Sequence, residues 1–303
     1  MTADDSPRMP ALASAQSPAA ATPVRFRRRS LFSRMPLRSR VALLIIAAMA
    51  LVVLAAPLLP LSDPLSGSLG ERLLPFFSPG HPLGTDTQGR DMVSRLVYGT
   101  RTSLFAGVVP IVIATVIGLL IGTVAGLAGR TVNTVLMRGV DLLFAFPGVL
   151  LSLLLAITLG VGLGTLILAL SLVWIAPVAR IAETEVARIR ELDFVTAARA
   201  SGAGQPAILF RQVIPVSLPA VLAYSTSLVG ANVAISGGLG FIGLGVPSPQ
   251  PELGSILYEM QAAIYVDVSL AILPVLVILL LSMLFPLVGD GVRDAIAGRG
   301  TAS

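Results

Sequence analysis

The chain has 303 residues, of which 55% are hydrophobic and 12% charged, and its formal net charge is +5. This composition is far from that of a soluble globular domain and predicts an integral membrane protein. The absence of cysteine and lysine and the single histidine exclude disulfides, thiolate or multi-histidine metal sites and a phosphate-binding G-x-x-x-x-G-K-[ST] loop in this chain.

The first 40 residues are rich in alanine, proline and serine and end in an arginine-rich run. This composition predicts a disordered cytoplasmic N-terminus over 1–40. The apolar run at 41–61 is longer than the roughly 7–15 residues of a signal-peptide core. It therefore predicts an uncleaved first transmembrane helix.

Five more apolar segments follow along the chain. Each has about the 20 residues that a helix rising about 1.5 Å per residue needs to cross about 30 Å of hydrocarbon. They cover 102–128, 140–160, 164–182, 217–240 and 267–289. Together with 41–61 they predict an all-α integral membrane protein with six transmembrane helices.

The positions of the arginines orient these helices, because cytoplasmic segments carry the excess of positive charge. With the N-terminus inside, all but four of the 21 basic residues lie on the cytoplasmic side, and the exceptions are Arg72, Arg90, Arg95 and Arg101. We therefore expect both termini in the cytoplasm, an extracytoplasmic segment at 62–101 and a cytoplasmic tail at 290–303. The basic charge then reflects topology, and no nucleic-acid partner is expected.

The segment 62–101 contains two acid–base pairs with the i,i+4 spacing of a helix. Asp86 pairs with Arg90 in this pattern, and Asp91 pairs with Arg95. The spacing predicts an interfacial helix with a solvated charged face. The alternative is that this face docks an external protein.

A polar, arginine-bearing insertion at 193–219 separates the fourth and fifth apolar segments. It predicts two short helices hinged at Gly202-Ala203-Gly204. Asp193 is the expected N-cap of the first helix and Pro206 belongs in the first turn of the second. On the residues alone, a docking surface for another protein and an ordinary interfacial helix–turn–helix are both open.

Glycines mark two further features. Gly118, Gly122 and Gly126 form a doubled G-x-x-x-G, which predicts close helix packing within this subunit or against a partner. The G-x-G-x-x-G at 238–243 follows an apolar span and not a strand. It therefore predicts a glycine-rich helix end and not a dinucleotide site.

Four segments resemble, in the same order, those of one known family. The first is the insertion, whose Thr196-Ala197-Ala198, Gly202, Ile214-Pro215 and Leu218-Pro219 resemble the EAA loop of binding-protein-dependent ABC importer permeases. The others are HPLGTDTQGRD at 81–91, FIGLG at 241–245 and GDGVRDA at 289–295. These three resemble signatures of the C-type subunit in the dipeptide/oligopeptide/nickel branch.

The resemblance implies a type I ABC importer transmembrane domain with one extra N-terminal helix. Its five-helix permease core would be 102–289, with a cytoplasmic coupling loop at 183–216. The implied partners are a second homologous permease subunit, two ATP-binding cassette ATPases, an extracytoplasmic solute-binding protein and the lipid bilayer of the bacterial inner membrane. ATP would bind to the ATPases, so no cofactor, metal or catalytic residue is expected here. The implied solute is a di- or oligopeptide, or a related small solute such as a nickel complex.

The family's ATPase contact maps onto the EAA-like loop. The matching positions are Asp193, Phe194, Thr196, Ala197, Ala198, Arg199, Gly202, Ile214, Pro215 and Pro219. Three residues depart from the pattern: Thr196 replaces the usual glutamate, Ser236 an acidic residue and Leu253 a tryptophan.

Polar side chains in the fifth span are candidates to line the pathway, with backbone capping or helix–helix hydrogen bonding as the alternative. They are Ser225, Thr226, Ser227, Asn232 and Ser236.

The alternative function for the whole protein is an ion-coupled secondary transporter without an ATPase. Such transporters usually place ionisable residues inside their spans, and these spans have essentially none. A membrane-embedded enzyme is disfavoured because no H-E-x-x-H, G-x-S-x-G or intramembrane aspartate pair occurs.

Overall fold

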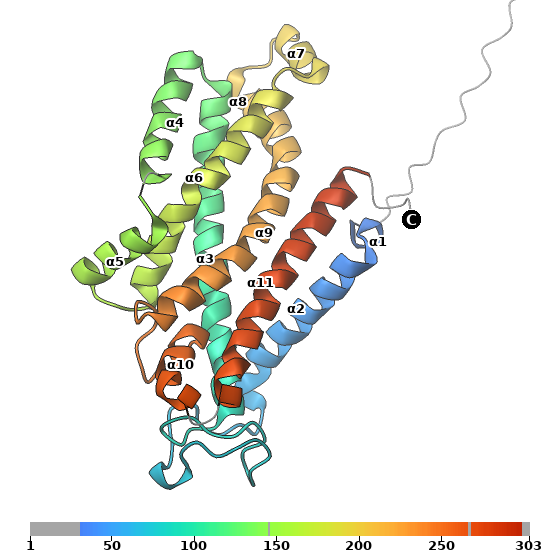
Figure 1. Ribbon diagram of the computed structural model, residues 1–303. Helices are drawn as coiled ribbons and strands as arrows, with labels where there is room; N and C mark the ends of the chain where they lie inside the picture. The colour runs from blue at the N-terminus through green and yellow to red at the C-terminus, as the bar shows by residue number, and fades with distance from the viewer. Residues whose placement is uncertain (1–30, 145, 266–267, 299–303) are drawn as a thin grey trace, which may run out of the picture.

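Helices make up most of the computed structural model, which describes residues 31–144, 146–265 and 268–298 (Figure 1). Most of the N-terminal segment predicted to be disordered, 1–30, lies outside the described residues. The prediction is wrong for 31–40, since α1 covers Leu31–Arg34 and α2 already begins at Leu37. Within the described ranges, β-structure is limited to two isolated bridges.

In the part of the chain that the structure describes, five helices are long and apolar enough to cross a membrane. They are α2 (Leu37–Ala55), α3 (Met92–Leu127), α6 (Leu163–Ile189), α9 (Ile214–Phe241) and α11 (Val268–Ile296). Most are longer than the apolar segments predicted for them. α11 extends into the predicted tail, and α3 begins ten residues before the predicted span.

The third predicted span is wrong as a single helix. It is a bent pair, α4 (Arg130–Phe144) and α5 (Gly148–Leu159), whose axes differ by 73°. Pro147 stands before α5 in an extended conformation. A proline disfavours helical backbone in the residue before it and cannot donate a helix hydrogen bond, so a helix is interrupted here. The described residues therefore contain five candidate spans, or six if this pair counts as one.

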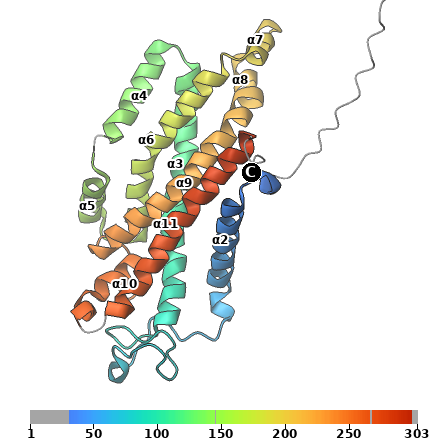
Figure 2. The ribbon, with the colours of Figure 1, turned by 45° about the vertical axis from the view of Figure 1, so that its right-hand side comes forward.

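The helices pack in an order that differs from their order in the chain (Figures 1 and 2). α2 packs on α11, α11 on α9, α9 on α3, and α3 on α6, while α4 and α5 cover α6. One end of the bundle carries the short helix α7 (Asp193–Ala200), the start of α2 and the end of α11. The opposite end carries residues 59–91, named the cap below, together with α10 (Leu253–Glu259).

Glycines allow the closest helix contacts. A Cβ at Gly122 would lie 2.4 Å from the carbonyl oxygen of Ala179 on α6 and 2.6 Å from the Cβ of Ala182. Gly118 and Gly126 meet α6 in the same way. The predicted close packing is therefore confirmed, and it occurs within this subunit between α3 and α6.

Candidate functional site: the knuckle and the cap

The insertion forms a compact knuckle, residues 193–204, between α6 and the next helix. α7 ends at a left-handed glycine, Gly202, with φ +83°. Two hydrogen bonds close the turn: Gly202 N donates to Arg199 O and Ala203 N donates to Ala198 O, each at 3.1 Å. This double closure satisfies carbonyls at the helix end that would otherwise lack partners. The predicted hinge is confirmed.

Two details of the predicted knuckle are wrong. The N-cap of α7 is Leu192, and Asp193 is the first helical residue. The second helix is also not short, because α8 (Gln205–Ile208) and a π-helical turn at Leu209–Val213 continue into α9. The result is one helical rod from Gln205 to Phe241. Pro206 does lie in its first turn, as predicted.

A small apolar core fixes the knuckle to this rod and to α6. Val195 of α7 is fully buried and packs in one cluster with Val186 and Ile189 of α6 and with Ile208 and Val213. One side of α7 is thus anchored on two helices that run through the bundle.

The other side of α7 is open. Phe194 has 43% of its surface exposed and Ala198 is half-buried. The other coupling residues predicted in the knuckle are all exposed, namely Asp193, Thr196, Ala197, Arg199 and Gly202. Beside α7 lies a hollow of about 630 Å³ whose lining includes Thr196, Arg199 and Arg190. The structure therefore brings this group together on one surface.

The rest of the predicted coupling set lies below the knuckle. Ile214, Pro215 and Pro219 belong to the first turns of α9, where Pro215 is exposed and the other two are half-buried. These three residues lie along the helical rod that follows the knuckle, and they are not part of the exposed surface of α7.

The predicted pathway residues fall into two groups. Ser225, Asn232 and Ser236 are buried inside the subunit. Asn232 accepts a hydrogen bond of 2.8 Å from Trp174 Nε1 and donates to the carbonyl of Gly107 at 2.8 Å, so it joins α9 to α6 and α3.

Ser225 also bonds to another helix, whereas the remaining candidates bond within α9. Ser225 accepts a 2.8 Å hydrogen bond from Thr115 of α3, and Ser236 donates to the carbonyl of Val233. The half-buried Thr226 and Ser227 donate to carbonyls of their own helix. These bonds are the helix–helix and backbone alternative of the sequence analysis, and a pathway role stays a prediction.

The cap end holds a buried ionic cluster. Arg90 Nε lies 2.6 Å from Asp86 Oδ2, and Arg95 Nη1 lies 2.6 Å from Glu259 Oε2 at the end of α10. Arg90 also contacts Glu259, and Arg95 also contacts Asp86. The Asp86, Arg90 and Arg95 side chains are at most 1% exposed. The predicted interfacial helix with a solvated face is therefore wrong.

Backbone geometry explains why these residues form a buried cluster and not the predicted solvated helix face. Asp86 and Arg90 lie in a loop, and Asp91 is the N-cap of α3, where its carboxylate accepts from Ser94 N at 2.8 Å. Asp91 also contacts His81 Nδ1 at 2.9 Å and not Arg95. Burial alone would raise the pKa of Asp86, but Arg95 and the hydrogen bond from Arg90 N outweigh it and hold that pKa below its usual range.

A second buried carboxylate, Glu252, caps α10 and was not identified from the sequence. It accepts hydrogen bonds from the backbone N–H groups of Gly254 and Ser255 at 3.0 and 2.9 Å, and from Ser103 Oγ of α3 at 2.8 Å. A Cβ at Gly240 would lie 2.4 Å from Glu252 Oε2. Burial raises the pKa of Glu252.

The glycine-rich signatures therefore act by close packing. Gly240, which precedes FIGLG, leaves room for Glu252, and Gly243 ends α9 in the left-handed region with φ +82°. In GDGVRDA, a Cβ at Gly289 would lie 2.1 Å from Ser227 Oγ of α9. One at Gly291 would lie 2.3 Å from Ser39 Cβ of α2. The two glycines let α11 approach both neighbours.

Comparison with known proteins agrees with this architecture. The family model described as "Binding-protein-dependent transport system inner membrane component" matches residues 118–299. The dipeptide transport system permease protein DppC of Haemophilus influenzae is 33% identical over 261 residues, covering 84% of this chain and 88% of that protein. The glutathione transport system permease protein GsiD of Pectobacterium atrosepticum is 32% identical over 219 residues, covering 72% and 73%.

Solved structures show the same fold. An inward-facing structure of the MetNI methionine ABC transporter aligns with a TM-score of 0.56 at 23% identity, covering 67% of this chain and 97% of that chain. An amino acid ABC transporter crystallised with histidines aligns with a TM-score of 0.52 at 16% identity, covering 65% and 92%. The chain belongs to the family of binding-protein-dependent inner-membrane components and is a multi-pass permease subunit of a type I ABC importer.

Proposed function

We propose that this permease subunit imports short peptides and receives the energy of ATP hydrolysis through the knuckle. The relatives whose printed names mention dipeptide and glutathione transport support a short peptide as the solute. A nickel complex or another small solute of the same branch is the second candidate. The proposed complex contains a second permease subunit, two ATPases and an extracytoplasmic binding protein.

The observation that carries the coupling role is the two-sided construction of α7. Its buried side is anchored through Val195 to α6 and to the rod that ends at Phe241. Its open side presents Phe194, Thr196 and Arg199. A force applied to α7 would therefore move two spanning helices together, which is what a coupling element between an ATPase and a transport pathway requires.

The distribution of arginine supports the orientation. The knuckle end carries Arg38, Arg130, Arg190 and Arg293 among others, whereas the cap end carries four arginines, of which Arg90 and Arg95 are neutralised in the buried cluster. By the positive-inside rule we place the knuckle and both chain ends in the cytoplasm and the cap outside.

Photo-crosslinking tests the partners directly. Because the chain has no cysteine, a single Thr196→Cys or Gly70→Cys variant can carry one benzophenone maleimide in the importer expressed from its native host. We expect the probe at 196 to capture an ATPase and the probe at 70, in the cap, to capture the binding protein. Capture of the ATPase from position 70, or of no ATPase from 196, would contradict the proposal.

The solute is tested separately. Proteoliposomes containing the full importer should accumulate a labelled dipeptide with ATP, and unlabelled glutathione or dipeptide should compete more strongly than a nickel complex. Competition by the nickel complex alone would assign the second candidate.

A further inference from the structure

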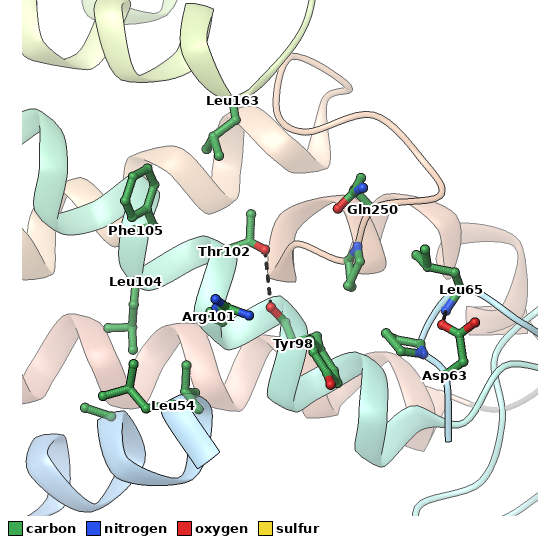
Figure 3. Close-up of a pocket in the computed structure, with 14 residues that line it drawn as sticks. Leu54, Asp63, Leu65, Tyr98, Arg101, Thr102, Leu104, Phe105, Leu163 and Gln250 are labelled. Carbon is green, nitrogen blue, oxygen red and sulfur yellow. Dashed lines mark hydrogen bonds between the residues drawn. The ribbon is translucent and has the colours of Figure 1, made fainter. Parts of the chain in front are cut away.

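A groove of about 870 Å³ runs along α3 at the cap end of the bundle (Figure 3). Its walls come from the end of α2, the early turns of α3, the start of α6, the cap and the loop that precedes α10. At one end of the groove the labelled side chains are apolar, namely Leu54, Leu104 and Phe105. At the other end lie Asp63, Leu65 and Gln250, with Arg101 and Tyr98 between the two groups.

This gradient follows depth in the membrane. Arg101 is the last charged residue before an uncharged stretch that ends at Arg130. Leu104 and Phe105 lie about one turn further into that stretch. Asp63 belongs to the cap, outside the spanning helices. The polar part of the groove thus lies at the membrane boundary and the apolar part lies at the level of lipid chains.

Arg101 has no counter-charge in the described part of the chain. It is exposed, and no hydrogen bond or ion pair joins its guanidinium to another described residue. A guanidinium at the edge of the hydrocarbon is stabilised by an anion, and its fork of donors fits a phosphate group. Basic pockets beside transmembrane helices bind lipid headgroups on this principle.

Asp63 supplies the opposite charge at the polar end. One of its oxygens accepts from Leu65 N at 2.9 Å, which leaves the other oxygen available. A ligand with a phosphate next to a primary ammonium would match Arg101 and Asp63 at once, and its apolar part would lie against Leu54, Leu104 and Phe105.

We propose that this groove is a binding site for a phospholipid with a primary amine in its headgroup, such as phosphatidylethanolamine. The phosphate binds Arg101, the ammonium binds Asp63, and an acyl chain lies along the apolar wall between α2 and α3. Phosphatidylcholine keeps the positive charge but has no N–H to donate, and phosphatidylglycerol has no ammonium. The site therefore prefers phosphatidylethanolamine to both.

Native mass spectrometry of the complete importer tests the site. After delipidation, the complex is titrated with phosphatidylethanolamine, phosphatidylcholine or phosphatidylglycerol. Arg101→Gln should weaken the binding of all three lipids, about tenfold for phosphatidylethanolamine, because a charge-assisted hydrogen bond is lost. Asp63→Asn should remove the preference for phosphatidylethanolamine over phosphatidylcholine.

The matched control is Arg130→Gln, which removes the arginine at the other end of the same uncharged stretch and should leave binding unchanged. Equal binding by the wild type and Arg101→Gln would overturn the proposal, as would wild-type binding of phosphatidylglycerol at least as strong as that of phosphatidylethanolamine. Displacement of the bound lipid by a free dipeptide would assign the groove to the solute instead. The Asp63→Asn comparison still decides the question if Arg101→Gln does not assemble.

Discussion

Replacing Gly202 by alanine isolates the contribution of the turn that closes the knuckle. The residue has φ +83°, and nothing lies within 4 Å of an added Cβ. The cost is therefore conformational and not steric, about 1–2 kcal/mol for a non-glycine residue in the left-handed region. This energy should favour opening of the turn by a factor of about 5–30 and weaken the two hydrogen bonds from Gly202 N and Ala203 N.

Hydrogen exchange in the reconstituted importer measures this opening. In Gly202→Ala, the amides of residues 198–203 should exchange about 5–30 times faster, with a parallel loss of ATP-driven uptake. Gly204→Ala is the matched control, because Gly204 has φ −68° and its Cβ would meet only Pro206 Cδ at 3.9 Å. It should leave exchange and uptake unchanged. Identical exchange in the two variants would refute the assignment of strain to Gly202.

The remaining predictions concern stability and are measured by thermal unfolding in detergent. Gly122→Ala should destabilise the folded protein by about 1–3 kcal/mol, because the added methyl group overpacks against α6. Gly139→Ala places its methyl group in open space and should be neutral or slightly stabilising. Equal unfolding midpoints for the two variants would contradict the close packing of α3 on α6. Arg95→Met should cost about 3–5 kcal/mol by leaving buried carboxylates unpaired. Asp141→Asn breaks the exposed ion pair between Asp141 and Arg180 and should cost under about 1 kcal/mol. Equal losses of stability in Arg95→Met and Asp141→Asn would argue against the buried cluster. Burial raises the pKa of Glu252 in the folded protein above its value of about 4 in the unfolded chain. Its contribution to stability is therefore full below about pH 4 and is lost as pH rises through the folded pKa. Glu252→Gln should abolish this fall of the unfolding midpoint with rising pH, and an unchanged pH dependence would assign it to another group.

The sequence was sufficient for features that depend on local composition. Apolar runs located the five long helices, the G-x-x-x-G spacing predicted a close helix contact for α3 without identifying α6, and Gly202 marked the end of α7. Each of these signals acts through residues that are close in the chain, so no knowledge of the tertiary structure was needed.

Features that depend on distant residues were missed. Glu259 is separated from Arg95 by 164 positions and from Arg90 by 169, so only the folded chain shows that the acid–base pairs near α3 are buried. The pattern of i,i+4 charges is the same for a solvated helix and for this cluster. A glutamate after proline in Pro251-Glu252 was a weak signal of a helix cap, and nothing local indicated that Ser103 would bond to it.

The extents of two helical regions were also misjudged. Pro147 was a local sign that the third span would break, yet its apolar flanks read as one continuous segment. After the knuckle, the polar insertion was predicted to hold only a second short helix that begins near Pro206. The rod instead runs on to Phe241. Pro206 lies in its first turn, where the missing N–H costs little, and Pro215 follows the π-helical turn at Leu209–Val213, where the regular helix hydrogen bonding is already interrupted.

Co-purification of the importer from its native host tests the central claim, that α7 transmits the work of the ATPase. The half-buried Ala198 is replaced by arginine, and Gly70→Arg adds the same charge in the cap as a control. We predict that the wild type and Gly70→Arg retain both an ATPase and a second permease, while Ala198→Arg keeps the second permease and loses the ATPase. Full retention of the ATPase by Ala198→Arg with unchanged uptake, or a wild type that is active alone, would contradict the account.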